Sequence, residues 1–232
     1  LTAKKASEYV SIRPGSDGLL AIAMMQLIIE WGQQDNETLS AKTVAPFLVK
    51  RSDGRYLRLS DLGKAEAGSE QDSVLVMNAQ GGPVPVCESP DLMIEGSFVV
   101  DGIEVDTAYS LLVKRLYEWN RKDIAIACDI PEEKIEEITR WYIDGPTAIF
   151  TGYGIDHWVN GHTFYLNMAA LAMVSGNIAK RGASITGDLS ASYIAPGADT
   201  SMIDYPMDSF ASMSINAMHL PDTLNSGKYG DQ

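Results

Sequence analysis

Two apolar runs, each preceded by a short extended segment and a turn, dominate the hydrophobic pattern of the chain. In the first, residues 9–12 are extended in character, residues 13–17 contain Pro and Gly, and residues 19–31 are almost wholly apolar before Gly32. This order predicts a strand, a turn and a helix that ends at a left-handed glycine. Because the run leaves hardly any polar face, the helix must be covered on most sides.

The second unit follows the same plan later in the chain. Residues 147–150 predict a short strand, residues 151–154 a glycine-bearing loop, and residues 161–176 a long helix. Between the two units, helical periodicity over residues 107–119 and again after Pro131 predicts two amphipathic helices.

Residues 46–106 have a different pattern, in which short β-branched and apolar runs alternate with turn pairs. Asp53-Gly54 and Asp101-Gly102 each lie between two such runs, which is a strong hairpin signal, and Gly81-Gly82 separates two more. We therefore expect one α/β domain over residues 1–232, with a layered sheet and flanking helices, and a β-hairpin-rich insertion at 46–106. The tail beyond Gly182 has no clear period.

Charge narrows the class of partner. Lys and Arg number 18 against 31 Asp and Glu, a formal net charge of −13, so the mean field of the protein repels nucleic acid and anionic membranes. A bound anion would need local donors such as the N–H groups of helix starts and glycine loops. The longest apolar stretch, 19–29, is too short to span a bilayer and indicates a buried helix. We expect neither nucleic-acid binding nor a membrane span.

The first candidate site is Pro14-Gly15-Ser16-Asp17, a tight turn with a hydroxyl and a carboxylate at a helix start. Backbone amides there favour a phosphate, and the carboxylate can accept from a base edge or a ribose. Ser16 or Asp17 can also cap the helix by accepting from its first N–H groups. From these residues alone, a capped helix without a ligand is the commoner outcome.

The second candidate site is the loop Gly152-Tyr153-Gly154 with Asp156 and His157, which follows the second strand. Small residues let a ligand approach the backbone closely, and an imidazole can donate or accept a hydrogen bond. In open α/β sheets, ligands lie beyond the carboxyl ends of strands. An ordinary loop with an aromatic anchor explains this sequence equally well.

Metal binding and cysteine chemistry have weaker support. His157 and His162 are five residues apart, which does not place both rings on one helix face, and no third metal ligand is evident. Cys87 and Cys128 have no neighbouring His or glycine elbow, so we expect both to be structural.

Several segments together resemble the molybdopterin oxidoreductases of the dimethyl sulfoxide reductase family. The helix start within residues 12–21, the loop 152–157 and the Gly-Asn-Ile helix end within 171–178 have the order and spacing common in that family. Segments 47–49 and 130–135 fit as well, so the resemblance covers nearly the whole chain.

The resemblance implies the fold of the middle domain of formate dehydrogenases and dimethyl sulfoxide reductases. It also implies a parent enzyme that holds molybdenum or tungsten between two molybdopterin guanine dinucleotides, with a 4Fe-4S cluster and metal ligand outside this segment. Gly15, Ser16 and Asp17 would meet a guanosine end, and Tyr153, Gly154 and His157 would lie near the pterin and phosphates. The partners implied are the rest of the same polypeptide and an electron-transfer subunit.

Three functional interpretations stay open. The first is a cofactor-binding segment of a redox enzyme, inactive alone; the second is a nonredox hydratase of the same family; the third is a freestanding α/β module that binds an anion or a protein. Formate dehydrogenases and related nitrate reductases of the family carry an Arg-Gly-Gln-like stretch shortly after the Gly-Asn helix end, and its Arg serves the metal site. No Arg follows Arg181 here, which disfavours formate oxidation. The sequence gives no indication of localisation, because a leader would lie outside it.

Overall fold

The computed structural model describes residues 2–86, 91–159, 161–178 and 180–187, without the side chains of Thr2, Tyr153, Asp156 and Thr186. These residues fall in the first of two compact units, Leu1–Asp188; the second, Leu189–Gln232, lies outside the described residues. Cys87 lies outside them too. The helices are α1 (Asp17–Glu30), α2 (Asn36–Lys42), α3 (Ala108–Leu116), α4 (Arg121–Cys128), α5 (Glu132–Ile143) and α6 (Gly161–Val174), with 3-10 turns η1 (Thr2–Lys4), η2 (Ser60–Leu62) and η3 (Tyr153–His157).

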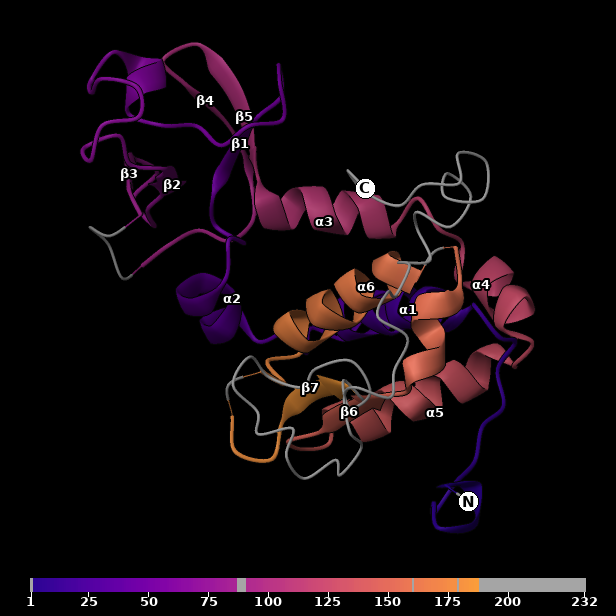
Figure 1. Cartoon of the computed structure of the whole chain (residues 1–232). Coiled ribbons are helices and arrows are strands. Elements are labelled where there is room, and N and C mark those ends of the chain that lie inside the picture. The colour runs from indigo at the N-terminus through magenta and orange to yellow at the C-terminus, as the bar shows by residue number, and fades with distance from the viewer. Residues whose placement is uncertain (1, 87–90, 160, 179, 188–232) are drawn as a thin grey trace, which may run out of the picture. The chain divides into compact units, whose positions relative to one another are not determined.

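Helix α1 is the centre of the main hydrophobic core. It contacts α3, α4, α5 and α6, and α6 runs beside it along much of its length (Figure 1). Every residue of α1 from 21 to 28 is buried. The prediction of a helix covered on most sides is confirmed, but the covering elements are mainly other helices.

Within the described part of the chain, the strands form three small sheets. Strands β1 (Leu48–Lys50), β5 (Ile103–Thr107) and β4 (Ser97–Val100) make an antiparallel sheet in that order, β2 (Leu75–Met77) pairs antiparallel with β3 (Pro83–Pro85), and β6 (Ala148–Thr151) pairs parallel with β7 (Ser184–Gly187). The described residues are thus mixed α/β, with small sheets and flanking helices.

The expected hairpins are present. Asp101 and Gly102 both have positive φ, 49° and 84°, which closes the tight β4–β5 turn, and the β2–β3 pair encloses Gly81. Near Asp53-Gly54 the second arm is shorter than expected, because Tyr56 makes only an isolated bridge to Val49 of β1.

The expected strand at residues 9–12 is wrong. This segment has no strand pairing with any described residue, and the chain is held just after it by a hydrogen bond from Arg13 N to Cys128 O at 2.9 Å. A β pattern needs a neighbouring strand edge to become a strand, and the residue that follows this segment is bonded to the end of α4 instead. Helices α2 and α4 and strand β7 were not anticipated from the sequence. No described helix is long and apolar enough to cross a membrane.

Candidate functional site

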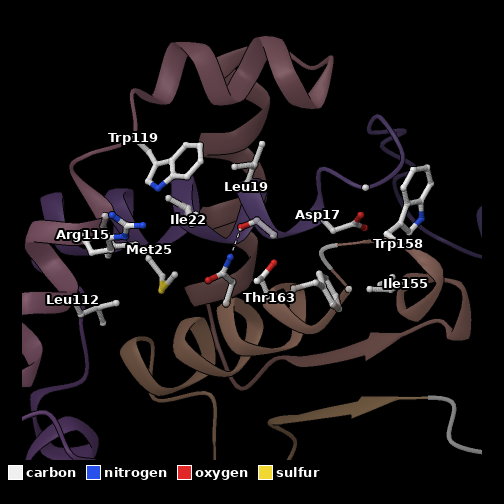
Figure 2. Close-up of a pocket in the computed structure, with 16 residues that line it drawn as sticks. Asp17, Leu19, Ile22, Met25, Leu112, Arg115, Trp119, Ile155, Trp158 and Thr163 are labelled. Atoms are coloured by element: carbon white, nitrogen blue, oxygen red, sulfur yellow. Dashed lines mark hydrogen bonds between the residues drawn. The ribbon is translucent and has the colours of Figure 1, made fainter. Parts of the chain in front are cut away.

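A cavity of about 420 Å³ lies beside the start of α1. Its walls come from the turn before α1, one face of α1, the first turns of α6, the η3 segment and one face of α3 (Figure 2). The volume is within the range of small-molecule pockets in proteins. The cavity therefore brings together the two loops that the sequence singled out separately.

Gly15 and Trp158 make the contact that joins the two loops. Gly15 has φ +84°, and a Cβ built on it would lie 3.1 Å from Cε3 of Trp158. The indole of the second loop therefore packs against the backbone of the first turn. A side chain at Gly15 would be strained by its backbone angle and crowded by this ring.

Asn167 provides a second connection between α1 and α6. Its Nδ2 donates to the carbonyl of Gly18 at 3.2 Å, and a Cβ on Gly18 would lie 3.2 Å from the same nitrogen and 3.6 Å from Phe164 Cα. The two helix starts thus approach closely because one carries a glycine. This places the starts of both helices near one cavity, although Leu19 N already donates to Ser16 O and Gly161 N to Trp158 O, both at 2.9 Å.

Ser16 occupies the N-cap position of α1 but does not cap it in the expected way. Its backbone angles are φ −99° and ψ 2°, and its hydroxyl donates back to Arg13 O at 2.6 Å instead of accepting from the helix. The hydroxyl therefore stabilises the turn itself. At α2 the N-cap residue, Asp35, does cap in the expected way: its Oδ1 accepts from the N–H of Thr38 at 2.8 Å.

Cys128 lies beneath this turn. Its side chain is fully buried, and its thiol donates to Ser16 O at 3.7 Å. Burial raises the pKa of the Cys128 thiol, and the nearby Asp17 carboxylate acts in the same direction, against the hydrogen bond to Ser16. A buried thiol with a raised pKa is a poor nucleophile.

Of the residues predicted for the first site, some line the cavity and others do not. Gly15 and Asp17 line the cavity, and Asp17 is half-buried in the first turn of α1. Pro14 is exposed, whereas Ser16 is buried and bonded within the turn.

From the second loop, Ile155 and Trp158 line the cavity. Both are sequence neighbours of the residues predicted there. Gly152 and Gly154 are exposed, and a Cβ on either would meet no described atom within 4 Å. His157 is exposed and does not line this cavity. The side chains of Tyr153 and Asp156 lie outside the described residues.

Sequence reasoning missed the wall that α3 provides. Leu112, Arg115, Leu116 and Trp119 line the cavity. Their spacing of three, four and seven residues is that of one helical face continued into the next turn. The pattern was visible in the sequence, but nothing in it indicated that this face meets the start of α1.

Among the described residues, one acidic side chain, Asp17, and one cationic side chain, Arg115, line the cavity. They lie toward opposite ends of the space (Figure 2). Since the whole chain is acidic, Arg115 and the helix N–H groups are the local donors available here to an anionic group. No group of three or more His, Cys, Asp and Glu among the described residues could hold a metal ion.

Most of the curated proteins similar to this chain are named as components of reductases. The chain is 30% identical over 185 residues to a putative dimethyl sulfoxide reductase catalytic protein of Halobacterium salinarum, a match that covers 78% of this chain and 22% of that protein. The chain is therefore related to the dimethyl sulfoxide reductase family of molybdopterin oxidoreductases. This similarity supports the resemblance at the level of the family and supports a segment of an oxidoreductase.

Two further relatives are also named as components of reductases. The alpha chain of the respiratory nitrate reductase of Haloferax mediterranei is 23% identical, over 79% of this chain and 21% of that protein. A selenate reductase component of Mesobacillus selenatarsenatis is 27% identical, over 98% of this chain and 23% of that protein. The chain spans about a fifth to a quarter of the length of these relatives. No family model matches the chain.

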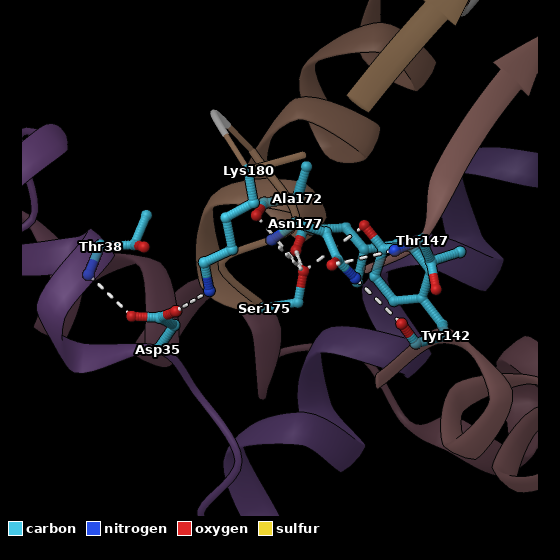
Figure 3. A network of polar contacts seen from close by, with 9 residues as sticks. Asp35, Thr38, Tyr142, Thr147, Ala172, Ser175, Asn177 and Lys180 are labelled. Atoms are coloured by element: carbon cyan, nitrogen blue, oxygen red, sulfur yellow. Dashed lines mark hydrogen bonds and ion pairs between the residues drawn. The ribbon is translucent and has the colours of Figure 1, made fainter. Parts of the chain in front are cut away.

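The Gly-Asn helix end common in the dimethyl sulfoxide reductase family forms a polar network here (Figure 3). Asn177 is buried; its Nδ2 donates to Tyr142 O at 2.9 Å, and its Oδ1 accepts from Thr147 N at 3.3 Å. One side chain thereby joins the end of α6 to the end of α5 and the approach to β6. The β6–η3 segment that carries the second loop is anchored at this point.

Gly176 and Asp35 extend the network toward α2. Gly176 has φ +70°, and a Cβ built on it would lie 2.6 Å from the Cβ of Asp35. Asp35 also accepts a hydrogen bond from Lys180 Nζ at 2.5 Å, and its N–H donates to Val174 O at 2.9 Å. The motif is thus explained by packing, since only glycine fits this angle and this space.

Proposed function

We propose that this chain is the part of a molybdenum or tungsten oxidoreductase that binds the guanine dinucleotide ends of its bis-molybdopterin cofactor. The observation that carries the proposal is the contact between Gly15 and Trp158, because it joins two loops far apart in the sequence around one cavity. The family similarity supports the same cofactor class.

The residues at the cavity suit a guanine nucleotide. The Asp17 carboxylate is an acceptor-only group, and the Watson–Crick edge of guanine offers N–H donors to it. The starts of α1 and α6 would face ribose oxygens. Trp158 would cover one side of the ligand. Gly152, Gly154, and the loop around Tyr153, Asp156 and His157 would lie near the pterin and phosphates.

When bound, the cofactor supplies the metal and the redox chemistry, and the protein supplies orientation. The role of this chain's own residues would be to fix the nucleotide at the acidic end of the cavity and to keep water from it with Trp158 and Ile155. We further propose that the rest of the enzyme contributes a 4Fe-4S cluster and the metal ligand. In that enzyme β6 and β7 would join the layered sheet of the family's middle domain, and an electron-transfer subunit would be the partner.

The redox function is preferred to the nonredox hydratase because the similar proteins are named as reductases or dehydrogenases. The names of these relatives refer to several different substrates, so they do not indicate which substrate this protein uses. We expect no formate oxidation, because residues 182–232 contain no Arg and hence no Arg-Gly-Gln-like stretch. Formate-dependent dye reduction by the enzyme that carries this chain would contradict that expectation.

The test is metal and nucleotide analysis of the enzyme that carries this chain. Asp17→Asn should lower its guanine nucleotide content and weaken binding about tenfold or more, the effect of losing one charge-assisted hydrogen bond. Asp123→Asn is the matched control, because Asp123 is also an acid in a helical first turn but is exposed on α4.

If the wild-type enzyme contains neither metal nor guanine nucleotide, the proposal is wrong and a freestanding binding module becomes the better hypothesis. If both variants keep the nucleotide, the cofactor-binding role of Asp17 is wrong even though the family is right.

A further inference from the structure

Helix α3 gives the cavity a wall that none of the family-like segments contains. Leu112 and Leu116 make it apolar, and Arg115 and Trp119 add a cation and an indole at its rim. Both rim side chains are well exposed to solvent, Arg115 by 72% and Trp119 by 44%. A ligand in the cavity would therefore cover surface that is now open to water.

The cavity is elongated along α1. Its lining includes Asp17 in the first turn and Met25 two turns further on. At 1.5 Å per residue, these eight steps along the helix correspond to about 12 Å. Figure 2 shows Asp17 and Trp158 at one end and Arg115 at the other. A ligand that fills the cavity would meet an acceptor at one end and a cation at the other.

A buried glutamine holds the α3 wall against α1. Gln26 is 2% exposed in an otherwise apolar stretch, and its Nε2 donates to Leu116 O and to Trp119 O, both at 2.8 Å. Its Oε1 has no partner among the described residues. Burying a partly unsatisfied amide costs stability, and it fixes the backbone that carries Trp119 beside the cavity.

Glu118 partly neutralises the positive charge of Arg115 at its end of the cavity. Arg115 in the last turn of α3 and Glu118 just after α3 form an ion pair at the surface. A guanidinium has five N–H donors in a planar fork, so Arg115 can keep this contact and still donate to a second anion. The pair is exposed and contributes little to stability, so its loss should not unfold the helix.

We infer that Arg115 and Trp119 are binding residues of the cavity. Arg115 donates to the diphosphate of a guanine nucleotide whose base lies at Asp17, and the Trp119 indole covers that ion pair from water. The inference rests on the proposed function and extends it to a helix outside the family-like segments. Excluding water from the pair strengthens it, because the local dielectric falls.

The test uses the enzyme that carries this chain, prepared without cofactor and titrated with GDP at low and high salt. Arg115→Gln should weaken GDP binding about tenfold, the effect of one ionic hydrogen bond, and should reduce the dependence of affinity on salt. Trp119→Ala should weaken binding and increase the salt dependence, because the remaining pair is more exposed. Glu118→Gln should strengthen binding.

Lys114→Gln and Tyr117→Ala are the matched controls, since both residues neighbour this face of α3 in sequence but do not line the cavity. Guanine nucleotide released from the cofactor-loaded enzyme gives a second readout, and circular dichroism confirms folding.

The outcomes separate this inference from the proposed function. If Asp17→Asn weakens GDP binding while Arg115→Gln and Trp119→Ala match their controls, the inference is overturned and the proposed function stands. If the wild-type protein neither binds GDP nor contains guanine nucleotide, both are wrong. Opposite salt effects of the two variants support the inference, because a merely structural role of α3 would move both in the same direction.

Discussion

The indole of Trp158 packs against the backbone of Gly15, with its Cε3 atom 3.1 Å from where a Cβ on that glycine would be. This contact joins the turn before α1 to the segment before α6. Because Gly15 also has φ +84°, the position excludes a side chain for two independent reasons. Together with the hydrogen bond from Asn167 to Gly18 O, this approach of ring to backbone holds the two segments at the cavity.

We expect Gly15→Ala to destabilise the protein more than Gly54→Ala. Both glycines have positive φ, 84° and 70°, so both substitutions carry a backbone cost of about 1 kcal/mol. A Cβ on Gly54 would meet nothing within 4 Å, whereas the one on Gly15 meets Trp158. The crowding should add about 1–3 kcal/mol to the loss in free energy of unfolding, measured by urea denaturation. Equal losses would show that Trp158 does not pack as described.

Gly176→Ala tests the network at the end of α6. Its new Cβ would lie 2.6 Å from the Cβ of Asp35, so the helix end or α2 must move. Gly32→Ala is the control, because Gly32 has a similar φ of 64° and open space around it. We expect Gly176→Ala to lower the thermal unfolding midpoint by several degrees more than the control does. A smaller effect than the control would contradict the packing.

The loss of folding stability at acid pH should depend in part on the Asp35 carboxyl. Burial raises the pKa of its carboxyl, but hydrogen bonds from Lys180 and from the N–H of Thr38 outweigh burial, and the pKa lies below its usual value. A carboxyl with a depressed folded-state pKa stabilises the protein above its unfolded pKa of about 3.9, and this stability is lost as pH falls through the folded value.

We therefore expect Asp35→Asn to lower the free energy of unfolding between about pH 5 and pH 7, with the gap to wild type closing below about pH 4. Asparagine keeps the N-cap of α2, so the comparison isolates the charge. Urea denaturation over this pH range measures it. A gap that widens as pH falls would mean that the Asp35 pKa is raised.

Cys128 should resist thiol reagents while the protein is folded. Its side chain is fully buried and burial raises its pKa, so the reactive thiolate is scarce and shielded. In a Cys87→Ser background, labelling by a disulfide reagent at neutral pH should be slow and become fast in denaturant. Rapid labelling of the native protein would show that the α1 start opens readily.

Local patterns predicted the elements whose causes lie within a few residues. The apolar run and Gly32 located α1, and Asp101-Gly102 located the β4–β5 turn, because such turns require positive φ. The family-like segments located the turn before α1, which does reach the cavity. At the loop before α6, the residues that reach the cavity, Ile155 and Trp158, neighbour those predicted.

Other features depended on partners distant in the sequence. The extended pattern of residues 9–12 found no strand edge to pair with, so it remained irregular. Ser16 was expected to cap α1, but the turn conformation directs its hydroxyl to Arg13 O. The buried Gln26 was visible as an interruption of an apolar run, and only the position of α3 gives its amide two carbonyl acceptors.

The sequence by itself determined the buried central helix, the hairpin turns, the family-like turn before α1 and the net negative charge, since each depends on residue type and short spacing. Only the tertiary structure decided that the Gly15 turn meets Trp158, that Arg115 of α3 and Trp119 just after α3 reach the same cavity, and that Gly176 packs on Asp35. The physical reason is that contacts between distant segments depend on how whole helices pack, and a local pattern contains no information on which faces will meet.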